Sequence, residues 1–400
     1  MWQRVSYEET DEAGGTVRIR TGATTAVMTG AGVCTALALL LTGCSGSADN
    51  DGKPASGTEA KNGDTAPLAD RASSVPKRPV PRGDGSEVPA DFNGDGHRDL
   101  VLNDLVKAPD AVQGDDAGIG IVYGSDSPRG VDPAVRQTLS PTANGAATDG
   151  VLPAAFDAAA TCDLDGDGFA DLIVSTDPPY DGLGRPPVPL QLLFGGPDGI
   201  TGKAVVLKIP AKARYGDDWP DHPVCGDFDG DGSPDLALSA SAGQVSYLRG
   251  PFSRAGAPKA ATAPVPGGGP VLYAPTGKAD TDGDGYDDLV HTTRTHEPGK
   301  AAKGKLLLGG PQGPGEAGGT YTFKAVALPP APRLPGADGK AATDLLESAD
   351  FLVTRTHQGE EKDLIALYPS EKSAKDGKDG KGGKAAERPA ITFSTSIFLK

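Results

Sequence analysis

Four acidic segments of the chain repeat the pattern Asp-x-Asx-Gly-Asp-Gly-x-x-Asp-Leu, and this repeat constrains the fold more than any other feature. We call them loop 1 (residues 91–99), loop 2 (163–171), loop 3 (227–235) and loop 4 (280–288), with positions numbered from 1 to 9. After position 9 the chain continues as Leu-Val-Leu, Leu-Ile-Val, Leu-Ala-Leu or Leu-Val, which is typical of a buried strand. Each loop is therefore expected to join two strands.

The loops place side-chain oxygens at positions 1, 3, 5 and 9, and a glycine at position 6 permits a sharp turn. Alternating oxygen ligands on a tight loop can face one centre, and hard donors in this number suit Ca²⁺ better than Mg²⁺ or Zn²⁺. An acidic turn without metal is the alternative, but four complete copies favour about four calcium sites. The loops are not EF-hands, because position 12 is never the bidentate glutamate of that motif.

The predicted ligands are the side chains at positions 1, 3, 5 and 9 and the backbone carbonyl at position 7. In chain order, the predicted metal-site residues are Asp91, Asn93, Asp95, His97, Asp99, Asp163, Asp165, Asp167, Phe169, Asp171, Asp227, Asp229, Asp231, Ser233, Asp235, Asp280, Asp282, Asp284, Tyr286 and Asp288. His97, Phe169, Ser233 and Tyr286 stand at position 7, so only their backbone carbonyls are expected to contribute.

A fifth, degenerate copy follows from aligning residues 289–296 with 351–357. This alignment puts Asp350 at position 9 and Ala342, Asp344 and Leu346 at positions 1, 3 and 5, so no strong calcium site is expected there. Position 9 then falls at residues 99, 171, 235, 288 and 350, and each interval has room for four short strands. Repeats of this length with four antiparallel strands predict an all-β fold, a β-propeller of four-stranded antiparallel blades. The last strand is expected at residues 390–399.

The loops and turns together resemble the FG-GAP/VCBS repeats of bacterial surface proteins and of the integrin α-subunit head. Besides the loops, Phe194-Gly195-Gly196-Pro197 and Leu308-Gly309-Gly310-Pro311 carry the likeness. The resemblance covers residues 85–400 and implies a propeller, commonly of seven blades, with calcium between the first two strands of a blade. Because the chain has room for five repeats, we expect five blades, with irregular closure or up to seven blades as alternatives.

Composition supports short strands and turns over long helices, since the chain has 57 glycines and 36 prolines among 400 residues. The formal net charge is −16, and fifteen carboxylates stand at the predicted ligand positions. Clustered carboxylates repel one another unless a cation joins them, which favours a bound metal. No nucleic-acid partner is expected, because no segment interleaves basic with aromatic residues.

Residues 1–44 are predicted to be a lipoprotein signal peptide. Arg18 and Arg20 precede an apolar stretch at residues 23–41, which ends in Leu41-Thr42-Gly43-Cys44. This ending resembles the lipobox of bacterial lipoproteins and implies that Cys44 is lipidated; an ordinary membrane anchor with a chance cysteine is the alternative. Residues 45–84 are expected to be a disordered tether, followed by the calcium-binding propeller at 85–400. The protein would then lie on the outer face of the cytoplasmic membrane, in the cell envelope.

Cys162 and Cys225 stand just before loops 2 and 3. Outside the cytoplasm a disulfide between them is allowed, and two small buried hydrophobic residues are the alternative.

The sequence gives no sign of an enzyme. It has no nucleophile elbow, zinc-protease motif or P-loop, so we predict no catalytic residues and no organic cofactor. A module that binds an extracellular protein or polysaccharide is the expected function. The alternative is a hydrolase or lyase acting on polysaccharide, which a convergent cluster of carboxylates, Tyr and His outside the loops would favour.

Overall fold

A computed structural model describes residues 75–103, 105, 118–179, 187–267, 269–296, 299–326, 343–347, 351–357, 363–369 and 388–399. They all belong to one compact unit, Thr65–Lys400. The predicted signal peptide, the predicted lipidation site Cys44 and most of the predicted tether lie outside the described residues. Residues 78–83 already contact the body: Arg78 forms a parallel bridge with Val135, and the Gly83 N–H donates to Asn93 O at 3.0 Å. Ordered contacts therefore begin before residue 85, the boundary expected from composition.

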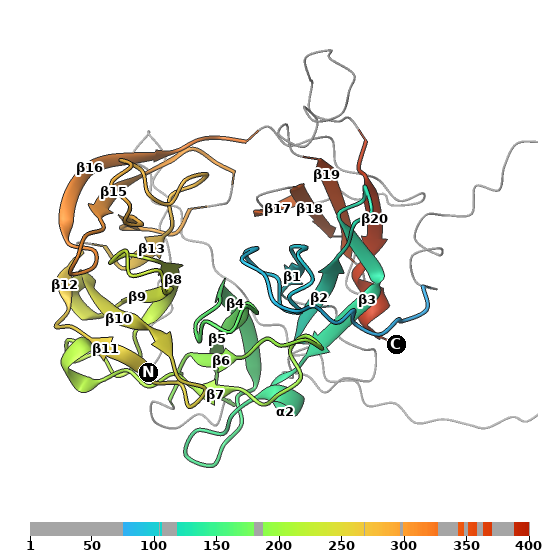
Figure 1. Cartoon of the computed structure of the whole chain (residues 1–400), viewed down its shortest axis with the longest axis horizontal. Helices are drawn as coiled ribbons and strands as arrows, with labels where there is room; N and C mark the ends of the chain where they lie inside the picture. The colour runs from blue at the N-terminus through green and yellow to red at the C-terminus, as the bar shows by residue number, and fades with distance from the viewer. Residues whose placement is uncertain are drawn as a thin grey trace, which may run out of the picture. The chain divides into compact units, whose positions relative to one another are not determined.

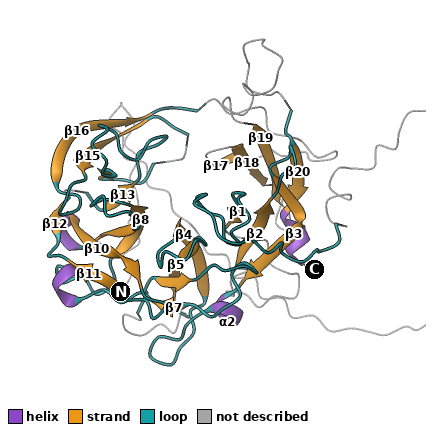
Figure 2. Cartoon of the chain, in the orientation of Figure 1, coloured by secondary structure: helices purple, strands orange, loops and turns teal. Residues whose placement is uncertain are grey.

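The described chain is all-β, with five antiparallel sheets of three to five strands and little helix (Figures 1 and 2). Sheet I has the order β1 (Leu100–Leu102), β2 (Ile119–Gly124), β3 (Val131–Leu139). Sheet II has the order β4 (Ala155–Cys162), β5 (Asp171–Asp177), β6 (Gln191–Leu193), β7 (Val205–Val206). Sheet III contains β8 (Asp221–Gly226), β9 (Asp235–Ser239), β10 (Gln244–Phe252), β11 (Pro258–Ala261) and β12 (Val265–Pro266).

The remaining strands form two four-stranded sheets. Sheet IV has the order β13 (Val271–Tyr273), β14 (Leu289–Thr292), β15 (Ala302–Leu308), β16 (Glu316–Phe323). Sheet V has the order β17 (Thr343–Glu347), β18 (Phe351–His357), β19 (Asp363–Pro369), β20 (Ile391–Ser394). Short helical turns are α2 (Pro141–Asn144), η1 (Ala211–Ala213), η2 (Ser241–Gly243) and η3 (Thr395–Leu399).

The central strands of the sheets are buried on both faces. In β2, Ile119, Ile121 and Tyr123 pack against sheet II, while Val122 packs in a separate cluster with sheet V. Alternate residues face opposite neighbours because strand side chains have a period of two. In β9, likewise, Leu236 and Leu238 pack with sheet II, and Ala237 packs with sheet IV. Burial on both faces explains the continuous apolar runs that follow the loops.

Sheets that are consecutive in sequence pack against one another, from sheet I to sheet IV. Sheet V, which contains the last strands, packs against sheet I, so that β1–β3 lie between β4–β7 and β17–β20 (Figure 1). The Arg136 Nε–H strengthens this junction by donating to Ile397 O at 3.0 Å. Within the described ranges, no core cluster joins sheets IV and V.

Two predicted segments differ from the structure. Residues 343–347 form β17, which pairs with β18, so Asp344 and Leu346 lie in a strand and not in a fifth loop as the alignment predicted. The alignment rested on residues 351–357, which do form a strand, but the preceding segment lacks the Gly-Asp-Gly that bends loops 1 to 4. At the chain's end, the predicted strand is confirmed over Ile391–Ser394, whereas Thr395–Leu399 turns into a 3-10 helix.

No helix in the described part of the chain combines the length and the apolar character needed to cross a membrane.

Candidate metal-binding loops

Loops 2, 3 and 4 connect the first two strands of sheets II, III and IV, and loop 1 leads directly into β1 of sheet I. Their hydrogen-bond patterns are similar. The carboxylate at position 1 accepts backbone N–H groups from positions 4 to 6: Gly94 and Gly96 donate to Asp91 at 2.8 and 2.7 Å. Gly166 and Gly168 donate to Asp163 in the same way, both at 2.8 Å. At position 5, one carboxylate oxygen accepts the N–H of position 7 at 3.0–3.2 Å in every loop. Aspartate side chains commonly form such short-range hydrogen bonds with the backbone in turns. Residues within each loop therefore favour its turn.

The carboxylate at position 9 is buried and joins distant parts of each repeat. Asp171 Oδ1 accepts the Gly195 N–H at 2.9 Å, and its Oδ2 accepts the Leu164 N–H at 2.9 Å. Asp99 and Asp288 bind equivalent pairs of N–H groups, whereas Asp235 accepts the Gly250 N–H and the Tyr247 hydroxyl. Each of these aspartates therefore ties its own loop to the second strand after that loop (β2, β6, β10 or β15) or to a residue just beyond that strand.

Burial makes the ionised form of these aspartates costly. It raises the pKa of Asp99 well above the usual range, although N–H donors from Gly124 and Phe92 oppose the rise. Burial likewise raises the pKa of Asp171 to about 8 and that of Asp235 to about 6. Neighbouring loop carboxylates add to each rise by repulsion. A cation placed among these groups would relieve both costs.

Three of the loops bring aspartate ligand atoms close enough to hold a metal ion. The groups are Asp163, Asp165 and Asp171; Asp227, Asp229 and Asp235; and Asp280, Asp282 and Asp288, with ligand atoms within 4.8 Å of one another. Each group combines positions 1, 3 and 9, and the position 5 carboxylates predicted as ligands are not part of it. Loop 1 has Asn93 at position 3 and therefore lacks the third carboxylate of such a group.

Several loop oxygens are buried without a donor. Asn93 is fully buried, yet its Oδ1 has no hydrogen-bond partner among the described residues. Asp165 Oδ1 and Asp227 Oδ1 are also buried and have no hydrogen-bond partner among the described residues. Because buried polar atoms are nearly always paired, these oxygens fit a cation that binds oxygen. No residue at positions 1, 3 or 9 offers an imidazole nitrogen or a sulfur ligand, so the donor set suits Ca²⁺ or another hard cation.

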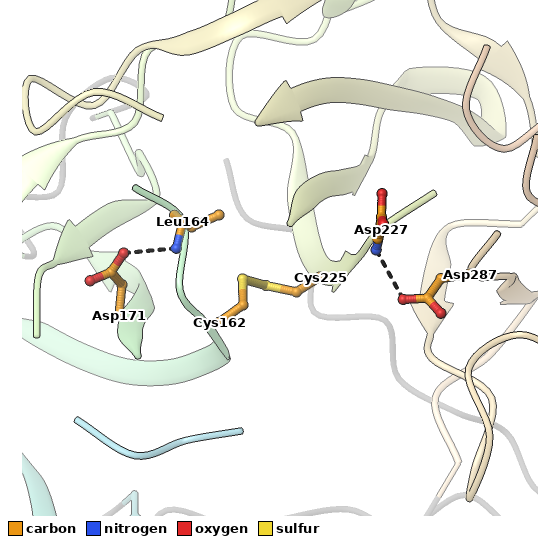
Figure 3. Close-up of a disulfide and its surroundings, with 6 residues drawn as sticks. All are labelled: Cys162, Leu164, Asp171, Cys225, Asp227 and Asp287. Atoms are coloured by element: carbon orange, nitrogen blue, oxygen red, sulfur yellow. Dashed lines mark hydrogen bonds between the residues drawn. A yellow bond between two sulfur atoms is a disulfide. The ribbon is translucent and has the colours of Figure 1, made fainter. Parts of the chain in front are cut away.

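The loops are also joints between neighbouring sheets. The carbonyl at position 2 accepts an N–H from the next sheet in three successive cases: Gly196 to Phe92, Phe252 to Leu164 and Gly310 to Phe228, at 2.7–3.0 Å. At the junction of loops 3 and 4, Asp287 Oδ2 also accepts the Asp227 N–H at 2.9 Å (Figure 3). If a loop opened, it would lose its own hydrogen bonds and would also loosen the contact between two neighbouring sheets.

Aromatic side chains at position 7 fill two of these joints. A Cβ atom on Gly94 of loop 1 would lie 2.5 Å from the ring of Phe169 in loop 2. One on Gly230 of loop 3 would lie 2.8 Å from the ring of Tyr286 in loop 4. Position 7 was predicted to supply only a carbonyl; the packing of these rings was not predicted. The sequence signal for this packing is a Gly at position 4 of one loop together with an aromatic residue at position 7 of the next loop.

Between loops 2 and 3, where position 7 is Ser233, a disulfide takes the place of the ring. Cys162 and Cys225 are bonded, with an S–S distance of 2.07 Å and Cα atoms 6.3 Å apart (Figure 3). They connect the ends of β4 and β8, immediately before the two loops. The disulfide thus holds the entry points of loops 2 and 3 at a fixed separation.

A separate cavity of about 530 Å³ lies beside the first strands of sheets II, III and IV. Its lining includes Asp221, His222 and Tyr273. His222 has a φ of 52°, an uncommon backbone conformation for a residue other than glycine, and its Nδ1 lies 3.4 Å from Ser239 Oγ. Non-glycine residues in this conformation concentrate at functional sites, so this cavity is the candidate site for an organic ligand.

No protein-family model matches this chain, and no curated protein matches its sequence. The resemblance to FG-GAP/VCBS repeats therefore stays a prediction that rests on the loops and the Gly-Gly-Pro turns.

The glycine that donates to position 9 provides a sharp test of the loop architecture. A Cβ on Gly195 would lie 2.2 Å from Ala170 O, and one on Gly309 would lie 2.3 Å from Asp287 O. We expect Gly195→Ala and Gly309→Ala each to lower the free energy of unfolding by about 1–3 kcal/mol, because the loop must shift. Urea unfolding followed by circular dichroism would measure this effect.

The adjacent glycines are matched controls for this prediction. A Cβ on Gly196 would come no closer than 3.9 Å to another atom, and one on Gly310 would meet nothing within 4 Å. Gly196→Ala and Gly310→Ala should therefore change the free energy of unfolding by less than about 0.5 kcal/mol. Equal losses in both pairs would contradict the proposed role of Gly195 and Gly309.

Proposed function

We propose that this chain is an exported, lipid-anchored protein whose body is a five-bladed calcium-binding β-propeller, and that it acts as a protein or polysaccharide interaction module at the cell envelope. Five consecutive antiparallel sheets support the propeller. The packing of sheet V against sheet I, which brings the last sheet beside the first, supports it as well. Each of sheets I to IV would be one blade with a calcium loop, and sheet V a blade without a complete loop.

The observation that carries the calcium proposal is the set of three aspartate groups with ligand atoms within 4.8 Å. The buried oxygens of Asn93, Asp165 and Asp227 that lack donors support it independently. Bound Ca²⁺ would supply the positive charge that offsets repulsion among the loop carboxylates. Because loops 1 to 3 are each hydrogen-bonded to the next sheet, we propose a structural role for the metal: it holds the blades together.

The cavity beside β4, β8 and β13 supports binding more than hydrolysis. Hydroxyl groups, His222 and Tyr273 line it together with aliphatic side chains, and Asp221 is the one carboxylate among its described lining residues. Glycosidases generally need two carboxyl groups, roughly 5–9.5 Å apart. A binding site for a polyhydroxylated ligand, such as a polysaccharide, fits this lining, and a hydrolase or lyase remains the alternative function.

Calcium removal tests the structural role. Titration calorimetry should find about four sites per chain, with dissociation constants of about 10⁻⁴–10⁻³ M if they resemble those of extracellular modules. At a hundredfold excess over the dissociation constant, each ion would stabilise the fold by about 2.7 kcal/mol. Excess EGTA should therefore lower the melting temperature by many degrees, as scanning calorimetry would show.

A matched pair of variants localises the effect. Asp163→Asn should remove one site, because Asp163 belongs to the aspartate group of loop 2. Asp177→Asn makes the same charge change at an exposed residue outside the loops and should keep all sites. An unchanged melting curve after chelation would overturn the structural role, and a stoichiometry of zero or one would overturn the calcium proposal itself.

Cys44 tests the lipid anchor. Cys44→Ala should abolish incorporation of radiolabelled palmitate and release the protein from the membrane fraction, because the lipidated side chain would be absent. Cys34→Ala, within the predicted apolar stretch, is the control and should keep both properties. Persistent labelling of the Cys44→Ala protein would rule out the lipobox assignment.

The cavity can be tested with arrayed polysaccharides. If the wild-type protein binds one of them, His222→Gly should weaken binding by roughly tenfold, the loss typical of a moderate contact residue. Glycine accepts the φ of 52° at this position, so the change removes the ring with little backbone cost. Tyr215→Gly is the control, since Tyr215 has a φ of 49° and is exposed outside the cavity. Release of new reducing ends from the bound polysaccharide would instead establish the hydrolase alternative.

A further inference from the structure

Loop 2 receives a basic side chain from the neighbouring sheet. Arg254 lies in the turn between β10 and β11 of sheet III, and its Nε is 2.7 Å from Asp165 Oδ2. Its Nη2 forms an ion pair with Asp167 Oδ2. The guanidinium also packs over the ring of Phe194, with its carbon 5.2 Å from the ring centroid. The Phe252 N–H, which donates to Leu164 O at 2.7 Å, fixes the strand end from which Arg254 reaches the loop.

Arg254 binds the oxygens that loop 2 would otherwise leave free. At position 5 the Oδ1 atom of Asp167 already accepts the Phe169 N–H, so Oδ2 is the oxygen open to a cation. Arg254 forms ion pairs with this atom and with Oδ2 of Asp165. The buried Oδ1 of Asp165 is left without a hydrogen-bond donor. The guanidinium therefore occupies part of the oxygen set at positions 3 and 5.

Loop 4 lacks this arrangement and serves as an internal comparison. Among the described residues, no basic group forms an ion pair with Asp282 or Asp284, which stand at positions 3 and 5. Its basic contact is Lys278, whose Nζ is 3.4 Å from Asp280 Oδ2 at position 1. The two loops have the same acidic residues at positions 1, 3, 5 and 9 but differ in the cation that the chain itself supplies.

We propose that Arg254 is a built-in counter-cation of loop 2, which competes with calcium for the carboxylates of Asp165 and Asp167. This inference rests on the proposed calcium function of the loops. A guanidinium and a divalent cation repel each other at such short range, so Arg254 lowers the affinity of loop 2 for calcium. In the metal-free protein the same charge reduces repulsion among Asp163, Asp165 and Asp167 and keeps the loop closed. Calcium binding to loop 2 would then release a turn of sheet III.

The test is titration calorimetry with calcium chloride on the chain from residue 45 onward. In Arg254→Ala, one site should bind calcium about three- to tenfold more tightly than in the wild type, since the competing charge is gone. Arg294→Ala, an equal charge change at an exposed residue outside the loops, should leave every site unchanged. In the Asp163→Asn background, where loop 2 is disabled, Arg254→Ala should have no effect on the remaining sites.

Thermal melting in EGTA gives a second readout. Arg254→Ala should melt at a lower temperature than the wild type without calcium, and this difference should shrink when calcium is saturating. Arg254→Gln should behave like Arg254→Ala, and it provides the calorimetric answer if the alanine variant does not fold. Unchanged or weaker calcium binding in both variants would overturn the inference while leaving the calcium function intact. A wild-type protein that binds no calcium would instead overturn the proposed function.

Discussion

The buried aspartate at position 9 is the interaction on which the loops and the sheets both depend. In loop 2, Asp171 receives one N–H from the start of its own loop and another from Gly195, after the third strand of the same sheet. Hydrogen bonds to a charged group contribute about 1.5–3 kcal/mol each, and leaving a buried charge unpaired costs more. One carboxylate therefore fixes both the loop's conformation and the place where the third strand ends. Gly195 is required at this place because a Cβ atom there would lie 2.2 Å from the carbonyl oxygen of Ala170, at position 8 of loop 2.

This arrangement has an electrostatic cost, which a cation placed in the loop would lower. In loops 1 to 3 the position 9 carboxylate is desolvated beside other carboxylates, and its pKa rises accordingly, to about 8 for Asp171. Without a cation, the protein must protonate some of these groups or tolerate their repulsion. The structure relieves part of the cost internally, with Arg254 at loop 2, Arg249 and Lys259 at loop 3, and Lys278 at loop 4. The loops consequently differ in how much they would gain from a metal.

Much of the fold was predictable from sequence because the signals are local. The Asp-x-Asp-Gly-Asp-Gly pattern sets the turns through hydrogen bonds within a few residues, and the apolar runs after position 9 do form β5 and β9. The strands of the fifth repeat form sheet V, but its degenerate loop was mispredicted for the converse reason. Without Gly-Asp-Gly, nothing local prevents residues 343–347 from pairing with β18, and pairing between strands is a nonlocal choice. The groups at positions 1, 3 and 9 were predicted as part of larger ligand sets, but their separation from position 5 was not. In loops 2 and 3, Arg254 and Lys259 reach position 5 from segments far away in sequence, which the loop pattern alone does not reveal. In loop 4, position 5 stands apart from the group although no described basic side chain pairs with it.

Three kinds of interaction hold neighbouring loops together: aromatic packing, a disulfide and ion pairs. Phe169 fills the space above Gly94, and Tyr286 fills that above Gly230, so those joints are held by ring packing against a bare backbone. Between loops 2 and 3 the ring is absent, and the Cys162–Cys225 disulfide and the Arg254 ion pairs stand there instead. A ring stabilises only when the loop geometry is already correct, because packing falls off steeply with distance. A disulfide also constrains the unfolded chain, and an arginine neutralises charge. The joint without a ring therefore has less need of a metal to remain closed than the joints that rely on aromatic packing.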